Sequence, residues 1–220
     1  MIKNSILTAF LILAISAPGS AVAGAQVREA VGAVTRTDVA VSLYGAFSGT
    51  TNGNGTTQSP SNAAGGLIEV RHIVNPIIGY EGTYSFNRAN QTYNPTSQVC
   101  PVNATPPCPS SSVAAISADA HEVTGNWVAS LKIANFRPFA LAGGGLLFNE
   151  PSGNQTNTNS STKGVFDYGA GLDWGLAPHL GIRFQYRGNL YKAPDLTKLY
   201  TSTGAFTHTS EPMIGVYFRL

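Results

Sequence analysis

The connections between the strand-like segments of this chain alternate strictly between long and short. Period-two alternation predicts β-strands at residues 38–48, 65–74, 77–88, 119–132, 137–149, 164–176, 179–191 and 207–220. The second, fourth and sixth connections are short (VNP, IANF and LAP), whereas the other four are long and rich in Asn, Ser, Thr, Gly and Pro. An antiparallel meander with all its long loops at one end produces this order. No helix is predicted after residue 25.

Most of the predicted strands have one apolar and one polar face. In residues 179–191, Leu180, Ile182 and Phe184 share one face, and Arg183 and Arg187 share the other. Residues 137–149 are too apolar and too rich in glycine for their faces to be assigned. A soluble barrel of lipocalin type would turn the apolar faces inward, and a transmembrane barrel would turn them outward against lipid.

The loop lengths favour the transmembrane arrangement, because membrane barrels join their strands by short periplasmic turns and longer extracellular loops. Charged residues make up 11% of the chain, against roughly 25% in ordinary soluble domains, which also fits a lipid-facing surface. The net charge is only +2 and the sequence contains no Lys or Arg run, so no nucleic-acid partner is expected. We therefore predict an all-β fold, an eight-stranded antiparallel up-and-down transmembrane β-barrel.

Residues 1–25 have the pattern of a secretory signal peptide. Lys3 precedes an apolar run at residues 6–17, and small residues follow, with cleavage expected after Ala23 or Ala25. The apolar run is shorter than the roughly 20 residues that a membrane-spanning helix needs. We expect a short periplasmic segment at residues 26–37, the barrel at residues 38–220, and export to the outer membrane of a Gram-negative-type bacterium.

The polar faces carry charges of both signs in roughly equal number. An eight-stranded barrel leaves an interior just wide enough for side chains, so charges inside it must find partners. We expect a structural network of ion pairs in the lumen, with a gated or leaky polar path as the functional alternative. The network is predicted to contain Glu69, Arg71, Glu81, Glu122, Lys132, Asp167, Asp173, Arg183, Arg187 and Arg219.

The C-terminal segment IGVYFRL carries a motif with Gly215, Phe218 and Leu220 at fixed spacing. It resembles the β-signal of the outer-membrane β-barrel superfamily, whose small members include the transmembrane domain of OmpA and OmpX. The resemblance covers residues 38–220 and implies recognition by the outer-membrane assembly machinery and pairing of the last strand with the first. Two positions depart from the family pattern, since Ile214 replaces a polar residue and Leu220 replaces an aromatic one.

Cys100 and Cys108 are the two cysteines of the chain. In an exported protein this spacing predicts a local disulfide in a long extracellular loop. A two-cysteine metal site is a weaker alternative, because the loop between them contains no His or acidic residue.

The start of the last strand carries a candidate catalytic pair. His208 and Ser210 have the spacing found in eight-stranded lipid A deacylases, and they would share the lipid-facing side. Glu211 points to the opposite face, and Glu150 does not lie on an adjacent strand, so neither can orient His208 as a triad requires. We predict no enzymatic activity, no cofactor and no metal site.

The long loops are where binding is expected, because a rigid scaffold commonly carries function on its loops. We predict a monomeric barrel with a structural or surface-interaction role in envelope integrity, adhesion or recognition. Its expected partners are the lipid bilayer, lipopolysaccharide, the assembly machinery and a surface ligand held by the loops. The alternatives are a lipid A-modifying enzyme and a small transport barrel or porin.

Overall fold

The computed structural model of the chain describes residues 35–95, 114–153, 155–200 and 202–220. The predicted signal peptide lies outside the described residues, as do Cys100 and Cys108, so the leader, its cleavage and the disulfide stay predictions. No helix that is long and apolar enough to cross a membrane occurs in the described part of the chain.

The described residues form ten strands. Their bounds are β1 Arg36–Ser48, β2 Thr51–Gly53, β3 Thr56–Pro60, β4 Ala63–Ile73, β5 Ile78–Pro95, β6 Ala114–Ser130, β7 Phe136–Pro151, β8 Ser161–Ala177, β9 Leu180–Lys192 and β10 Phe206–Arg219.

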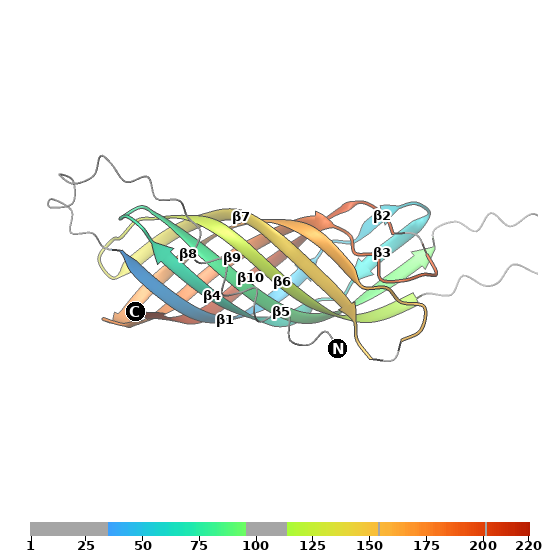
Figure 1. Cartoon of the computed structure of the whole chain (residues 1–220), viewed down its shortest axis with the longest axis horizontal. Helices are drawn as coiled ribbons and strands as arrows, with labels where there is room; N and C mark the ends of the chain where they lie inside the picture. The colour runs from blue at the N-terminus through green and yellow to red at the C-terminus, as the bar shows by residue number, and fades with distance from the viewer. Residues whose placement is uncertain (1–34, 96–113, 154, 201) are drawn as a thin grey trace, which may run out of the picture. The chain divides into compact units, whose positions relative to one another are not determined.

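Eight of these strands close into one antiparallel barrel (Figure 1). Its order is β1-β4-β5-β6-β7-β8-β9-β10, and the ring closes because β10 pairs with β1, for example at Val41 and Val216. Closure leaves the barrel without a free sheet edge along its length. The predicted eight-stranded up-and-down barrel is therefore confirmed, including the pairing of the last strand with the first.

The first long connection, predicted as a loop, contains a hairpin. Strands β2 and β3 turn at Asn54 and Gly55, whose φ angles are 50° and 72°. An Asn-Gly pair with both residues at positive φ is a favoured two-residue hairpin turn. Strand β3 pairs with the outer end of β5, from Thr56 opposite Pro95 to Pro60 opposite Gln91. The Asn-Gly pair is a sequence signal for a hairpin turn. The segments that flank it lack the apolar residues by which strands are predicted.

Strands β5 and β6 are also longer than predicted, because their outer ends pair with each other as far as Tyr93 and Ala114. Their outward side chains change from Tyr84 and Phe86 to Arg88, which is exposed. The predicted strands end where the apolar face ends, because an apolar face was the criterion for predicting a strand. Hydrogen bonding between β5 and β6 continues beyond that apolar face.

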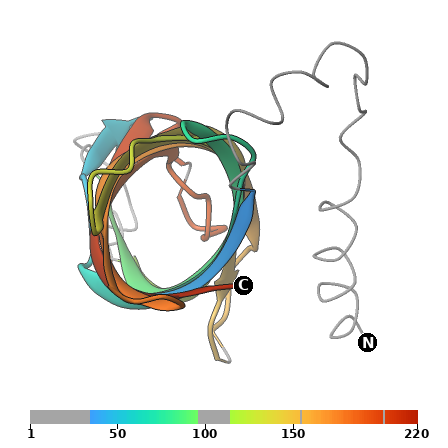
Figure 2. The same ribbon diagram turned by 90° about the vertical axis from the view of Figure 1, so that its left-hand side faces the viewer.

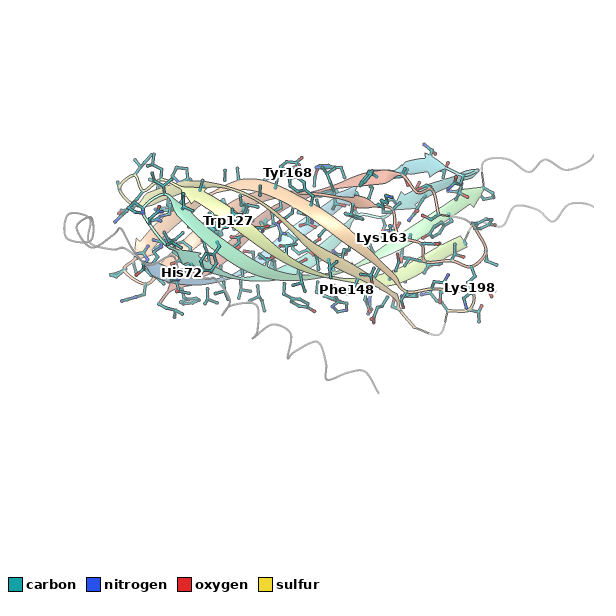
Figure 3. All side chains as sticks on the ribbon, turned by 45° about the horizontal axis from the view of Figure 1, so that its top comes forward. His72, Trp127, Phe148, Lys163, Tyr168 and Lys198 are labelled. Carbon is teal, nitrogen blue, oxygen red and sulfur yellow. The ribbon has the colours of Figure 1, made fainter. Side chains whose placement is uncertain are left out.

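Apolar and aromatic side chains cover the outside of the barrel. Trp127 is 70% exposed, and Tyr168 also lies on the outer surface (Figure 3). We call this surface the apolar belt; it includes Val41, Leu43, Ile68, Val70, Tyr80, Phe86, Trp127, Phe166, Tyr168, Trp174, Phe184, Tyr186, Ile214, Val216 and Phe218. An apolar exterior around a polar interior is the arrangement of a membrane barrel and the reverse of a lipocalin.

The faces of β7, which the sequence left unassigned, are fixed by the structure. Arg137, Phe139, Leu141 and Leu147 are buried and point into the barrel. Apolar side chains thus enter the lumen from this strand, which is why no polar face was visible in its sequence.

The seam between β1 and β10 depends on a small residue at Gly215. A Cβ atom there would lie 2.5 Å from the backbone oxygen of Val41 and would also collide with Ser42. Gly215→Val should therefore oppose closure, at a cost of roughly 1–3 kcal/mol for overpacking. We expect a smaller folded, heat-modifiable fraction on gels. Gly82→Val is the matched control, because no atom of the described residues lies within 4 Å of a Cβ at Gly82. Equal losses in both variants would contradict the prediction.

Candidate functional site

The barrel interior contains a layer of buried charges on the side of the short turns. We call it the periplasmic-side cluster; it consists of Arg36, Asp38, Glu69, Arg71, Glu81, Arg137, Asp173 and Arg183. Period-two alternation turns these side chains inward from β1, β4, β5, β7, β8 and β9. Four arginines thus face four carboxylates, so the layer is balanced in charge.

Two arginine–carboxylate pairs, each joined by two hydrogen bonds, organise this cluster. Arg183 donates from Nε and Nη2 to the two carboxylate oxygens of Asp173, at 2.6 and 2.8 Å. Arg71 donates from Nε and Nη2 to Oε2 of Glu81, at 2.9 and 2.7 Å. Glu69 contacts both arginines, with its Oε1 3.3 Å from Nη2 of Arg71. Charge-assisted pairs of this kind hold each side chain in one orientation.

Aromatic rings fill the space around these arginines. The guanidinium carbon of Arg71 lies 4.0 Å from the ring centre of Phe139, and that of Arg183 lies 5.3 Å from the same ring and 5.4 Å from Tyr217. These distances are within the range of cation–π contacts. Ion pairs and rings together pack the lumen on the side of the short turns.

Two predicted members of the network lie elsewhere. Lys132 is exposed in the turn between β6 and β7, so its assignment to the lumen was wrong. The predicted strand ran two residues beyond Ser130, where β6 ends and alternation no longer fixes a side chain's direction. Arg219 lies at the barrel end, with its side chain 32% exposed and its Nε 4.0 Å from Asp38.

A second group of buried charges lies toward the long loops. We call it the extracellular-side cluster; it consists of Glu122, Asp167, Arg187 and Glu211. Nη2 of Arg187 lies 3.1 Å from Oε1 of Glu122 and 2.8 Å from Oδ2 of Asp167.

A neutral residue joins the two clusters. Nδ2 of Asn126 donates to Oε1 of Glu81 at 3.2 Å and to Oδ2 of Asp167 at 2.8 Å. The hydrogen-bonded network therefore continues from the periplasmic-side cluster into the extracellular-side cluster.

Four buried charges were not predicted as part of the network. Arg36 lies before the predicted first strand at residues 38–48, and Arg137 lies on the strand whose faces could not be assigned. Asp38 and Glu211 could have been found, because they occupy inward positions of β1 and β10 by simple alternation.

The connection between β9 and β10 folds into the extracellular mouth of the barrel. Figure 2, which looks along the barrel, shows this segment inside the ring. We call the described residues of this connection, 193–200 and 202–205, the plug. Leu196 is fully buried and packs with Tyr93, Ile116 and Ala118. This long connection lies at the end of the barrel predicted for the long loops, but it turns back into the mouth instead of extending away from it.

Hydrogen bonds fix the plug to its neighbours. Nε2 of Gln58 and the hydroxyl of Tyr93 both donate to the backbone oxygen of Pro194, each at 3.0 Å. The backbone N–H of Leu196 donates to the hydroxyl of Tyr93 at 3.1 Å. Burial raises the pKa of Tyr93, which lies beyond the apolar belt, to about 12, so its hydroxyl stays protonated near neutral pH. Thr203 adds a hydroxyl contact of 2.9 Å to Thr51.

The residues weighed as a catalytic site do not form a triad. His208 and Ser210 do share the outer face, but Nε2 of His208 lies 3.0 Å from the hydroxyl of Tyr168 and Oγ of Ser210 lies 3.0 Å from that of Tyr186. Glu211 is buried on the other face, and Glu150 is exposed on β7. Within the described residues, no group of three or more His, Cys, Asp or Glu side chains is placed to hold a metal ion.

The chain was compared with known proteins. A family model described as outer membrane protein beta-barrel domain matches residues 6–209. The crystal structure of Neisserial surface protein A is similar with a TM-score of 0.54 and 12% identity, over 83% of this chain and 96% of that one. The outer membrane protein OprG from Pseudomonas aeruginosa is similar with a TM-score of 0.55 and 8% identity, over 86% and 97% of the two chains. No curated protein matches the sequence significantly. At these identities the two solved structures support the fold alone.

Proposed function

This chain belongs to the outer membrane protein β-barrel family, and from that premise we propose that it is a closed barrel with a surface-interaction role. It lies in the lipid bilayer of the outer membrane, with the apolar belt against lipid. In this proposal the barrel is an anchor, and the β-structure beyond the membrane carries the function.

The observation that carries the proposal is the continuation of the sheet beyond the apolar belt. Strands β5 and β6 remain paired past Arg88 and Asp119, which form a bidentate ion pair with distances of 2.5 and 3.0 Å. Strand β3 joins the same extension through β5. A paired extension offers a partner a surface whose backbone is already ordered, and preorganisation of this kind favours binding.

The alternatives are less well supported. A transport barrel needs a polar path, but the plug and the two charged clusters occupy the lumen. A lipid A-modifying enzyme needs an oriented general base, but among the described residues His208 contacts the Tyr168 hydroxyl and no carboxylate. We also propose that the barrel works as a monomer and that Gly215, Phe218 and Leu220 are read by the assembly machinery.

The proposal is tested by trimming the extension at its own register. Asn90 pairs directly with Ser117, so replacing residues 91–116 by an Asn-Gly turn joins β5 to β6 without shifting the barrel strands. A strain lacking the gene should attach less to surfaces. The wild-type gene should restore attachment, and the trimmed gene should not, although both proteins reach the outer membrane in folded, heat-modifiable form.

Full restoration by the trimmed barrel would show that the extension does not carry the function. A change in lipid A mass on deletion of the gene would instead favour the enzymatic alternative.

A further inference from the structure

The extracellular-side cluster contains more negative than positive charge. Three carboxylates, Glu122, Asp167 and Glu211, share one arginine, Arg187, and all four side chains are at least nine-tenths buried. Arg187 forms ion pairs with Glu122 and Asp167 only, so Glu211 has no cation within 4.0 Å among the described residues. The periplasmic-side cluster has as many arginines as carboxylates, so it supplies no net positive charge to this layer. Uncompensated buried carboxylates are costly, so this layer is stabilised either by a bound cation or by protonation.

A cavity lies beside the surplus charge. Its volume is about 30 Å³, and its lining includes Glu122, Glu211, Asn149, Asn189 and Tyr191. A single water needs roughly 10–15 Å³ on this measure, so the cavity has room for an ion with a water molecule.

Two side-chain oxygen atoms of residues that line this cavity are without a hydrogen-bond partner among the described residues. They are Oε2 of Glu211 and Oδ1 of Asn189, and these side chains are 3% and 1% exposed. The other end of the Asn189 amide is fixed, because Nδ2 donates to Glu122 at 3.0 and 3.3 Å. Its oxygen is therefore held in one orientation.

The donor set is oxygen only. Carboxylate and amide oxygens are the ligands of hard cations, in contrast to the nitrogen and sulfur ligands that select zinc or copper. A divalent ion would match the two surplus charges. Ca²⁺ accepts mixed oxygen ligands in flexible geometry, whereas Mg²⁺ demands near-ideal octahedral geometry and usually keeps several waters, for which this cavity is small.

We propose that the cavity binds one hard divalent cation of the Ca²⁺ type. Glu211 and Asn189 are direct ligands of the cation. Glu122 completes the charge balance, and hydrogen bonds from Arg187 and Asn189 hold the Glu122 carboxylate in place. This site lies inside the barrel and is separate from the surface role proposed above.

The test uses the refolded full-length barrel in detergent, with Ca²⁺ as the probe after treatment with a chelator. Equilibrium dialysis should find one Ca²⁺ per barrel. Glu211→Gln keeps the shape and removes a charged ligand, so binding should weaken by at least about 10–100-fold. Glu150→Gln, the same change at an exposed position, should bind as the wild type does.

A stability measurement separates ion binding from misfolding. Ca²⁺ should raise the urea midpoint of the wild type and leave that of Glu211→Gln unchanged, since only a state that binds the ion is stabilised. In chelator, Glu211→Gln should resist urea at least as well as the wild type, because it removes a surplus charge.

Three results would overturn the proposal. They are no stoichiometric binding by the wild type, equal stabilisation of both proteins by Ca²⁺, and a wild type stabilised by acid but not by Ca²⁺. The third would mean that protons balance the charge.

Discussion

Replacing Arg183 by alanine is expected to lower the free energy of unfolding by roughly 3–5 kcal/mol, the usual cost of removing one partner from a buried ion pair. Arg183 is fully buried and bidentate to Asp173, and it contacts Glu69. Its loss leaves both carboxylates short of a partner in a space with little room for water. Urea unfolding in detergent or lipid vesicles, followed by tryptophan fluorescence, measures the change.

Two further variants make the measurement specific. Lys198→Ala removes an exposed positive charge and should change stability by no more than about 0.5 kcal/mol. Arg183→Met keeps apolar bulk near Phe139 and Tyr217 while removing the charge, so it should be more stable than Arg183→Ala but less stable than the wild type. Equal losses for Arg183→Ala and Lys198→Ala would show that the buried network contributes little.

The barrel could be predicted from the sequence because two independent regularities agree. Alternation along each strand assigned the inward position of Arg183 and the outward position of Phe184, and connection lengths assigned which strands are neighbours. Lipid outside and charges inside impose a period of two on nearly every strand. Strand β7 is the exception, since Phe139 and Leu141 lie inside the barrel and its two faces are similar in polarity.

The contents of the extracellular mouth could not be predicted in the same way. The plug has no period that marks it, and Leu196 is buried only because β5 and β6 place Tyr93, Ile116 and Ala118 around it. Likewise, the pairing of Arg187 with Glu122 joins positions 65 residues apart, on strands that are not neighbours in the sheet. Alternation places each charge inside the barrel, but the tilt and stagger of the strands decide which charges meet.

Leu196→Asp is expected to release the plug from the barrel mouth. Truncating a buried leucine costs roughly 2–5 kcal/mol, and burying an unpaired carboxylate adds to that cost. A cost of only about 2 kcal/mol would raise the open population of the plug about 30-fold, since 1.4 kcal/mol is a factor of ten. Proteinase K added to intact cells should therefore cut the variant within residues 193–205 much faster than the wild type. Leu199→Asp is the control, because Leu199 is 55% exposed in the same segment.

Ion conductance in planar bilayers distinguishes a plug that closes an open channel from one that covers a filled barrel. Below the plug, Arg187 still links Glu122 to Asp167, and Arg71 and Arg183 still pack on Phe139 with their carboxylates. These layers lie in series, so opening the mouth alone gives ions no continuous path. The wild type and Leu196→Asp should both lack large, stable single-channel currents, even where the protease cuts the variant. Large currents from the variant alone would make the plug a gate and the protein a small porin, and large currents from the wild type would mean that the charged clusters leave an open path.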